Sequence, residues 1–158
     1  MRAVWLSGLT ALALGAGLFW YLAPLDPGVL VLQFAFTPRT FGQIVHFWSP
    51  ADLARYRSHL PVDVALLLAY GVFGYLCATR AGVFAVRAPS FRRVLQWLLP
   101  VAACFDALEN ALHWWLTAVP RFGVAPLYAV SAGASSLKWL LILGFGLLSV
   151  YALYRADD

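Results

Sequence analysis

The sequence predicts an all-α membrane protein in which four transmembrane helices form a bundle and a long outer loop carries short helices. Composition is the first observation: 63% of the 158 residues are hydrophobic and 11% are charged, whereas soluble domains are about 45–50% apolar and about 25% charged. The second is that the apolar residues gather into stretches that each suffice to cross a bilayer, which takes about 20 residues. The length leaves no room for a second domain, so we expect a single transmembrane domain over residues 1–158.

The first predicted span covers residues 3–23. A secretory signal peptide is the alternative interpretation, because Arg2 precedes the apolar stretch. The stretch is longer than a signal core of roughly 7–15 residues, and it ends in Phe19-Trp20-Tyr21 where a signal peptidase needs small residues. Aromatic residues at this place are typical of the membrane interface, so we interpret the segment as a span.

Residues 24–60 form the predicted outer loop. Residues 29–36 are interpreted as extended chain or as a segment that dips into the interface. Two short helices follow, because Thr37-Pro38 and Ser49-Pro50 each place a capping residue before a proline that suits the first helical position. Each short helix has an apolar side, which predicts that both lie on the membrane surface as a lid over the bundle.

The other predicted spans cover residues 61–79, 94–119 and 126–154. Orientation follows from the arginines, because cytoplasmic loops are enriched in Lys and Arg. The side of the two termini holds Arg2, Arg80, Arg87, Arg92, Arg93 and Arg155, and the other side holds Arg39, Arg55, Arg57 and Arg121. We therefore predict that both termini are cytoplasmic and that the long loop lies outside. The basic residues form no run, so the net charge of +4 does not predict binding to nucleic acid.

Four polar residues of the third span fall on one helical face. Asp106, Glu109, Asn110 and His113 are spaced at i, i+3, i+4 and i+7. An ionisable group inside a membrane helix costs roughly 2.5–3.5 kcal/mol on insertion scales, and the interior of the bundle is the direction of least cost. The spacing therefore predicts that these side chains point together into the bundle.

The neighbouring spans supply partners for this face. Lys138 lies near the middle of the fourth span, with Ser131 and Ser135 on its side of the helix and Trp139 beside it. The second span contributes Asp63 and, seven residues later, Tyr70. In antiparallel neighbours, Asp63 is expected at the depth of His113 and Lys138 near Asp106. Three spans are thus predicted to converge on one polar pocket that opens towards the outer side.

The charges of this predicted pocket do not balance, because three acids accompany one lysine. We expect that one acid is protonated, that His113 is charged, or that Arg55 or Arg57 folds in from the loop. A protonated acid beside an ionised one is the arrangement that general acid and base catalysis needs.

Less specific interpretations stay open. Polar contacts help to pair membrane helices, so Lys138 with Asp106 or Glu109 is also what a purely structural lock predicts. A metal site of Asp106, Glu109 and His113 is disfavoured, because one histidine beside a lysine suits a transition metal poorly. The two cysteines, the loop histidines His46 and His59 and the tryptophans at span ends have ordinary roles: buried apolar residues, solvated groups and interfacial anchors. Trp48 belongs with the anchors, and Trp139 either walls a pocket or faces lipid.

The sequence resembles an uncharacterised family of small bacterial four-span membrane proteins that share an Asp-x-x-Glu-Asn motif. The residues that carry the resemblance are Phe34-Ala35-Phe36-Thr37, Arg55-Tyr56, Asp63, Tyr70, Asp106-Ala107-Leu108-Glu109-Asn110 and Lys138-Trp139. The resemblance implies the four-span fold, a bacterial inner membrane and the importance of these positions, but no activity. A more distant likeness, to the emopamil-binding-protein group, is one of architecture alone.

These features favour a protein that binds an amphiphilic lipid- or isoprenoid-like molecule in the polar pocket. Asp106 and Glu109 are the central acids, candidates for catalysis, and Lys138 is their counter-ion. The other binding residues are Asp63, Tyr70, Asn110, His113, Ser135 and Trp139. An enzyme that acts by proton transfer is a close variant, and no cofactor or metal is expected. The alternatives are a structural or assembly subunit, in contact with a membrane-protein partner or a second copy, and a proton or cation transporter.

Overall fold

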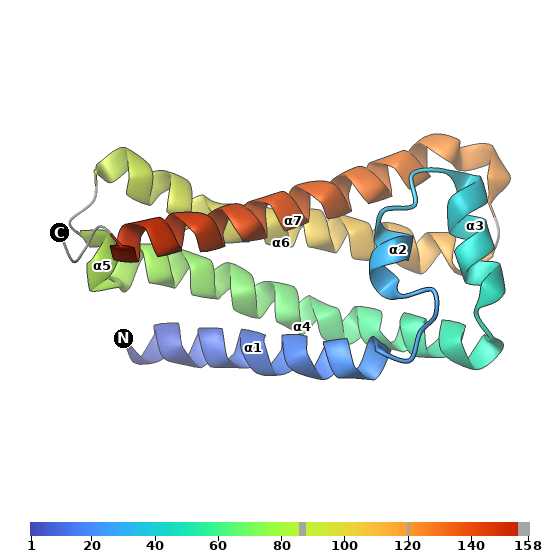
Figure 1. Ribbon diagram of the computed structural model, residues 1–158, viewed down its shortest axis with the longest axis horizontal. Coiled ribbons are helices and arrows are strands. Elements are labelled where there is room, and N and C mark those ends of the chain that lie inside the picture. The colour runs from blue at the N-terminus through green and yellow to red at the C-terminus, as the bar shows by residue number, and fades with distance from the viewer. Residues whose placement is uncertain (86–87, 120, 155–158) are drawn as a thin grey trace.

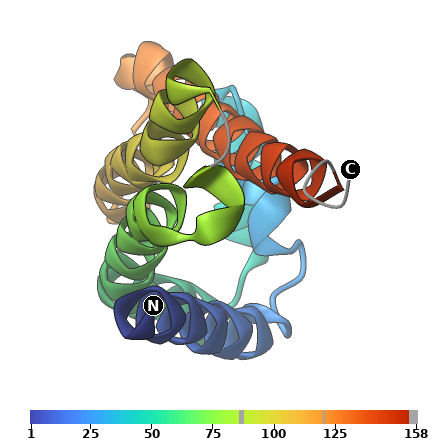
Figure 2. The same ribbon diagram turned by 90° about the vertical axis from the view of Figure 1, so that its left-hand side faces the viewer.

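Four long helices of this computed structural model run along its long axis (Figure 1). They are α1 (Arg2–Leu22), α4 (Pro50–Arg80), α6 (Pro89–Leu116) and α7 (Ala125–Tyr154). The structure describes residues 1–85, 88–119 and 121–154, and these hold helices and no strand. Viewed end-on in Figure 2, α4 and α6 lie between α1 and α7. The all-helical class predicted from the sequence is therefore confirmed for the described residues.

Three of the long helices are long and apolar enough to cross a membrane: α1, α4 and α7 with the short helix that precedes it. Large apolar side chains cover their outer faces, such as Trp20, Leu140 and Leu147, which are 81%, 65% and 72% exposed. Apolar exposure on this scale marks a surface that contacts another apolar phase. These features indicate a membrane protein. The helix α6 has 28 residues but is not among the three, and its acids and Asn110 make it less apolar.

The polar face of α6 points into the bundle, as its spacing predicts. Asp106, Glu109, Asn110 and His113 are all buried. The structure therefore places the least apolar residues of this helix where its neighbours cover them. The helix is also longer than predicted at its start, because Pro89 occupies its first position, five residues before the predicted span begins.

The segment between α1 and α4 folds over one end of the bundle, which we call the cap end (Figure 1). It contains α2 (Val29–Gln33) and α3 (Pro38–Phe47). Of the two interpretations of residues 29–36, extended chain is therefore wrong for residues 29–33. The helix α3 begins as expected, because the Thr37 hydroxyl accepts a hydrogen bond from the Thr40 amide at 3.1 Å. Both short helices bury apolar side chains in one core with α4, α6 and α7, namely Leu32, Phe41, Ile44, Tyr56, Leu116 and Tyr128.

The second predicted loop helix and the second span form one continuous helix. The Ser49 hydroxyl and Asp52 carboxylate cap the backbone amides at its start, as the Ser-Pro signal predicts. Pro61, where a new span was expected to begin, lies inside α4. Neighbouring helices compensate for an internal proline in such helices, and here burial of Tyr56 and Leu60 anchors the turns before it.

Two predictions about side chains of the cap end are wrong. His59 is buried rather than solvated, because residues 50–60 are part of α4 and this face packs inward. Trp48 is buried rather than interfacial, and its indole N–H donates to the Pro27 carbonyl at 2.9 Å. In contrast, His46 is exposed as predicted.

Glycines let α4 and α6 approach closely. A Cβ atom on Gly74 would lie 2.5 Å from Cβ of Leu99, and one on Gly71 would lie 3.3 Å from Cβ of Ala103. Small residues at such contacts bring two helix backbones together and strengthen their packing. This contact sets the spacing between the helices that carry Tyr70 and Asp106.

The opposite end is the one where α1 begins and α7 ends (Figure 1). Here Phe84 of the short helix α5 (Gly82–Ala85) packs in a core with Leu95, Leu99 and Phe145. Arg2, Arg80, Arg92 and Arg93 belong to this end, whereas Arg87 and Arg155, which also entered the orientation argument, lie outside the described residues. The bundle is therefore apolar inside at one end and polar towards the cap end.

Candidate functional site

The predicted site residues of α4, α6 and α7 meet in the middle of the bundle. Lys138 is central: its Nζ lies 3.0 Å from Oδ1 of Asp106 and 2.7 Å from Oε2 of Glu109. The Tyr70 hydroxyl donates to Oδ2 of Asp106 at 2.9 Å. The predicted proximity of Lys138 and Asp106 is thus observed. One lysine is shared by two buried carboxylates, an arrangement that holds negative charge in a low-dielectric interior.

The network continues from Glu109 towards the cap end. Oε1 of Glu109 lies 3.9 Å from Nδ1 of His113, and the same nitrogen is hydrogen-bonded to the Tyr56 hydroxyl at 2.5 Å. Beside it, the Asn110 amide donates to Oδ2 of Asp63 at 2.6 Å. Asp63 was expected at the depth of His113, but it pairs with Asn110, one helical turn away. We call these buried and partly buried residues together the polar cluster: Tyr56, Asp63, Tyr70, Asp106, Glu109, Asn110, His113 and Lys138.

The arginines of the loop do not neutralise the surplus acids. The Arg57 guanidinium donates to the Thr117 hydroxyl at 2.8 Å and to the Trp114 carbonyl at 2.9 Å, so it contacts the end of α6. Arg55 lies over the ring of Tyr21. Neither has a carboxylate within 4.0 Å among the described residues. Of the three predicted ways to balance the charge, folding-in of an arginine is therefore wrong.

Ser135 and Trp139 lie on either side of Lys138 on α7. Ser135 is fully buried, and its hydroxyl donates to the Ser131 carbonyl at 3.1 Å. Trp139 is half-buried and donates to the Gln33 side chain of α2 at 3.0 Å. It lines an apolar groove of about 910 Å³ between α1 and α7. Trp139 thus lines this groove and not the predicted polar pocket, and a role against lipid stays a prediction.

Sequence reasoning missed Tyr56 as a member of the polar cluster. Tyr56, Asp63 and Tyr70 stand seven residues apart, which places them on one helical face. This spacing was a signal that could have found it. The predicted boundary at Pro61 concealed it, because it assigned Tyr56 and Asp63 to different elements.

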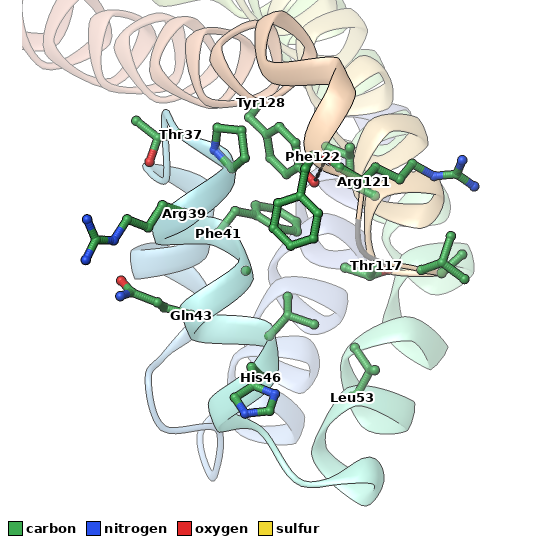
Figure 3. Close-up of a pocket in the computed structure, with 16 residues that line it drawn as sticks. Thr37, Arg39, Phe41, Gln43, His46, Leu53, Thr117, Arg121, Phe122 and Tyr128 are labelled. Atoms are coloured by element: carbon green, nitrogen blue, oxygen red, sulfur yellow. Dashed lines mark hydrogen bonds between the residues drawn. The ribbon is translucent and has the colours of Figure 1, made fainter.

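A cavity of about 790 Å³ lies beneath α3, at the cap end of the bundle. Its walls come from α3, the start of α4, the end of α6, the short helix η1 (Phe122–Val124) and the start of α7 (Figure 3). We call it the α3 cavity. Its interior is mostly apolar, with Phe41, Leu53 and Leu116 among its walls, and its volume lies within the roughly 300–1,000 Å³ of small-molecule sites.

Phe41 separates the α3 cavity from the polar cluster. The Phe41 ring, which lines the cavity, packs edge-on against the ring of His113 at a centroid distance of 5.4 Å and against Tyr128 at 5.1 Å. Thr117 lines the cavity as well, and its hydroxyl donates to the His113 carbonyl at 2.6 Å. Phe41 of α3 therefore lies between the cavity and His113 of the polar cluster.

The arrangement can hold charge and exchange protons within a dry interior. Glu109 and His113 are each 1% exposed, so contact with water does not stabilise a charge on either side chain. No group of three or more His, Cys, Asp or Glu side chains among the described residues is arranged to hold a metal ion. Comparisons of the chain with protein-family models, with curated proteins and with solved structures found no match.

Proposed function

We propose that this chain is a four-span protein of a bacterial inner membrane that binds an amphiphilic lipid- or isoprenoid-like molecule. In this proposal α6 is the fourth spanning helix, because its polar face is buried and only its apolar faces meet lipid. Both termini are cytoplasmic and the cap end faces outward. The ligand enters the α3 cavity and reaches the polar cluster when Phe41 moves aside.

The observation that carries the proposal is the contact of Phe41 with His113. This contact places an apolar cavity of ligand size next to the polar cluster. The cluster contains more ionisable groups than the pairing of two helices needs. Lys138 with Asp106 alone would lock α6 to α7. Asp63, Asn110 and His113 extend the polar contacts well beyond that lock, towards the cavity.

In the enzymatic variant of the proposal, Glu109 is the group that transfers a proton. It stands between Lys138, which stabilises its carboxylate, and His113, which borders the cavity through Phe41. Glu109 would give its proton to the ligand, and the resulting carboxylate would remain paired with Lys138. Asp106, held by Tyr70 and Lys138, keeps the second negative charge in place.

The test compares wild-type protein with Glu109→Gln by native mass spectrometry in detergent, together with lipid extraction. We expect a stoichiometric ligand on the wild type and its loss from the variant, since the amide keeps the shape and removes the charge and the proton. The matched control is Asp26→Asn, which removes an exposed loop carboxylate and should retain the ligand. Circular dichroism and thermal unfolding verify that each variant is folded.

A folded Glu109→Gln protein that carries the ligand as wild type does would overturn the proposal. A wild type without ligand, with a variant that is merely less stable, would favour the second candidate, a structural or assembly subunit. One observation favours that candidate: an apolar groove of about 910 Å³ lies between α1 and α7, where a partner or a second copy could dock. Its walls include small residues of α1, such as Ala11 and Gly15.

A further inference from the structure

We propose that the ligand of the α3 cavity is an amphiphile with an acidic headgroup, whose chain lies in the cavity and whose headgroup meets Arg39 and Arg121 at its rim. This inference rests on the proposed function, because it assigns the chemical class of the same ligand. It is carried by the charges around the cavity and by the shape of its interior.

The walls of the α3 cavity carry positive charge and no negative charge. Arg39 of α3 and Arg121, which directly precedes η1, both line it, and no Asp or Glu is among the lining residues. Figure 3 shows the two guanidinium groups on opposite sides of the cavity, each directed outward. Their positive charge attracts an acidic group to the rim and repels a cationic one, and a direct contact requires that the two outward-pointing side chains turn towards the rim.

These arginines have no acidic partner within the protein. Among the described residues, every ion pair within 4.0 Å involves Lys138 or His113, so neither Arg39 nor Arg121 is paired with a carboxylate. Arg55 and Arg57 are two further cations of the cap end that have no carboxylate within 4.0 Å among the described residues. An arginine left without a carboxylate retains the planar set of N–H donors that recognises phosphates and carboxylates.

Arg121 packs against Trp115 beside the cavity. Its guanidinium lies 3.8 Å from the centre of the Trp115 ring, a cation–π contact that leaves the edge of the guanidinium free to donate. Its Nε is buried and has no hydrogen-bond partner. A buried N–H without a partner is costly, and a turn of the side chain towards an acceptor at the rim relieves that cost.

The interior of the cavity suits an apolar chain. Phe41, Leu53, Leu116 and Phe122 line it, and Gly42 of α3 leaves room there, since a Cβ atom at Gly42 would meet no atom within 4 Å. A chain in this space ends against Phe41, behind which His113 and the polar cluster lie. The chain end, rather than the headgroup, is therefore the part of the ligand that approaches the cluster.

The test uses three single-chain lipids with the same oleoyl chain and different headgroups: lysophosphatidic acid, lysophosphatidylcholine and the uncharged monoolein. Delipidated wild type is titrated with each, and bound equivalents are counted by native mass spectrometry. We expect one equivalent of lysophosphatidic acid to bind more tightly than the other two, with an affinity that falls as salt is added. Equal affinity for all three lipids would overturn the proposal.

Two pairs of variants separate the headgroup contact from the cavity. Arg39→Gln/Arg121→Gln should bind lysophosphatidic acid about tenfold more weakly for each arginine removed. Arg55→Gln, a charge loss at the same end outside the cavity lining, should bind it as wild type does. Gly42→Trp fills the cavity and should abolish binding of all three lipids, whereas Gly17→Trp, at an open position on α1, should not.

Three further results test where the lipid binds. An Arg55→Gln protein as weak as the double variant would show that acidic lipids merely gather around a basic surface. Unchanged binding by Gly42→Trp would show that the chain lies elsewhere. Glu109→Gln separates the two proposals: if it binds lysophosphatidic acid normally while the arginine and Gly42 variants do not, the cavity assignment stands and the role of the polar cluster in binding fails.

Discussion

Lys138 is the central cation of the polar cluster. It is the only lysine of the sequence, it is buried, and it contacts two carboxylates at 3.0 and 2.7 Å. Two acids on one helix would repel each other in a low-dielectric interior without a cation between them. Lys138 is therefore the residue on which the packing of Asp106 beside Glu109 depends.

Replacing Lys138 with methionine should destabilise the protein strongly. Removing one partner of a buried ion pair typically costs about 3–5 kcal/mol, because the other partner is left charged and unpaired. The free energy of unfolding in detergent micelles measures the effect. Arg93→Gln, the loss of an exposed cation, is the control and should change it by at most about 0.5 kcal/mol.

The double variant Asp106→Asn/Lys138→Met should recover part of the lost stability, since one of the stranded charges is also removed. A Lys138→Met protein as stable as Arg93→Gln would contradict the assignment, because it would mean that water reaches Asp106 and Glu109.

At the scale of elements, the cluster exists because α4 and α6 lie close together. Gly74 contacts Leu99 so closely that a side chain there has no space. Tyr70 lies one turn before Gly74 on α4, and its hydroxyl reaches Asp106 across the interface. Any widening of this interface should therefore also lengthen the bond between Tyr70 and Asp106.

Gly74→Val should lower the free energy of unfolding by about 1–3 kcal/mol, the usual range for side chains that overfill a packed interface. Gly144→Val on α7 is the matched control, because a Cβ atom there meets no atom within 4 Å. Thermal unfolding of both variants in the same detergent makes the comparison. Equal stability of the two would contradict the close packing of α4 against α6.

At the scale of the whole molecule, the polarity of the bundle interior differs between its two ends. The end where the chain begins is filled with apolar side chains such as Leu95 and Phe145, whereas ionisable groups lead from the centre to the cap end. The α3 cavity lies at the cap end as well. In the proposed membrane orientation, a ligand or a proton reaches the cluster from the outer side.

The four-span proposal predicts that the two ends of α6 lie on opposite sides of the membrane. Single cysteines at Ser90, in the first turn of α6, and at Gly123, after the helix, should react with a membrane-impermeant maleimide from opposite sides of sealed vesicles. Cys77 and Cys104 are first replaced by alanine, and that protein without cysteines is the control for background labelling. Labelling of both positions from one side would show that α6 does not cross.

The sequence predicted the parts of this protein that depend on local spacing. The polar face of α6 follows from a separation of three and four residues, and the starts of α3 and α4 follow from Thr37-Pro38 and Ser49-Pro50. The same spacing, together with an antiparallel arrangement of neighbouring helices, was enough to predict that Lys138 lies near Asp106. Local periodicity determines these features because a helix converts sequence distance directly into direction.

Only the tertiary structure decided what lies around them. Burial of Tyr56 and His59 made one helix of the segments on either side of Pro61, although the proline by itself predicts a boundary. The fold of α3 over the end of α6 brought Phe41 to His113 and left the α3 cavity between arginines that lie far apart in the sequence. Such contacts depend on how segments far apart in the sequence pack against one another. No local sequence pattern specifies which of their side chains meet.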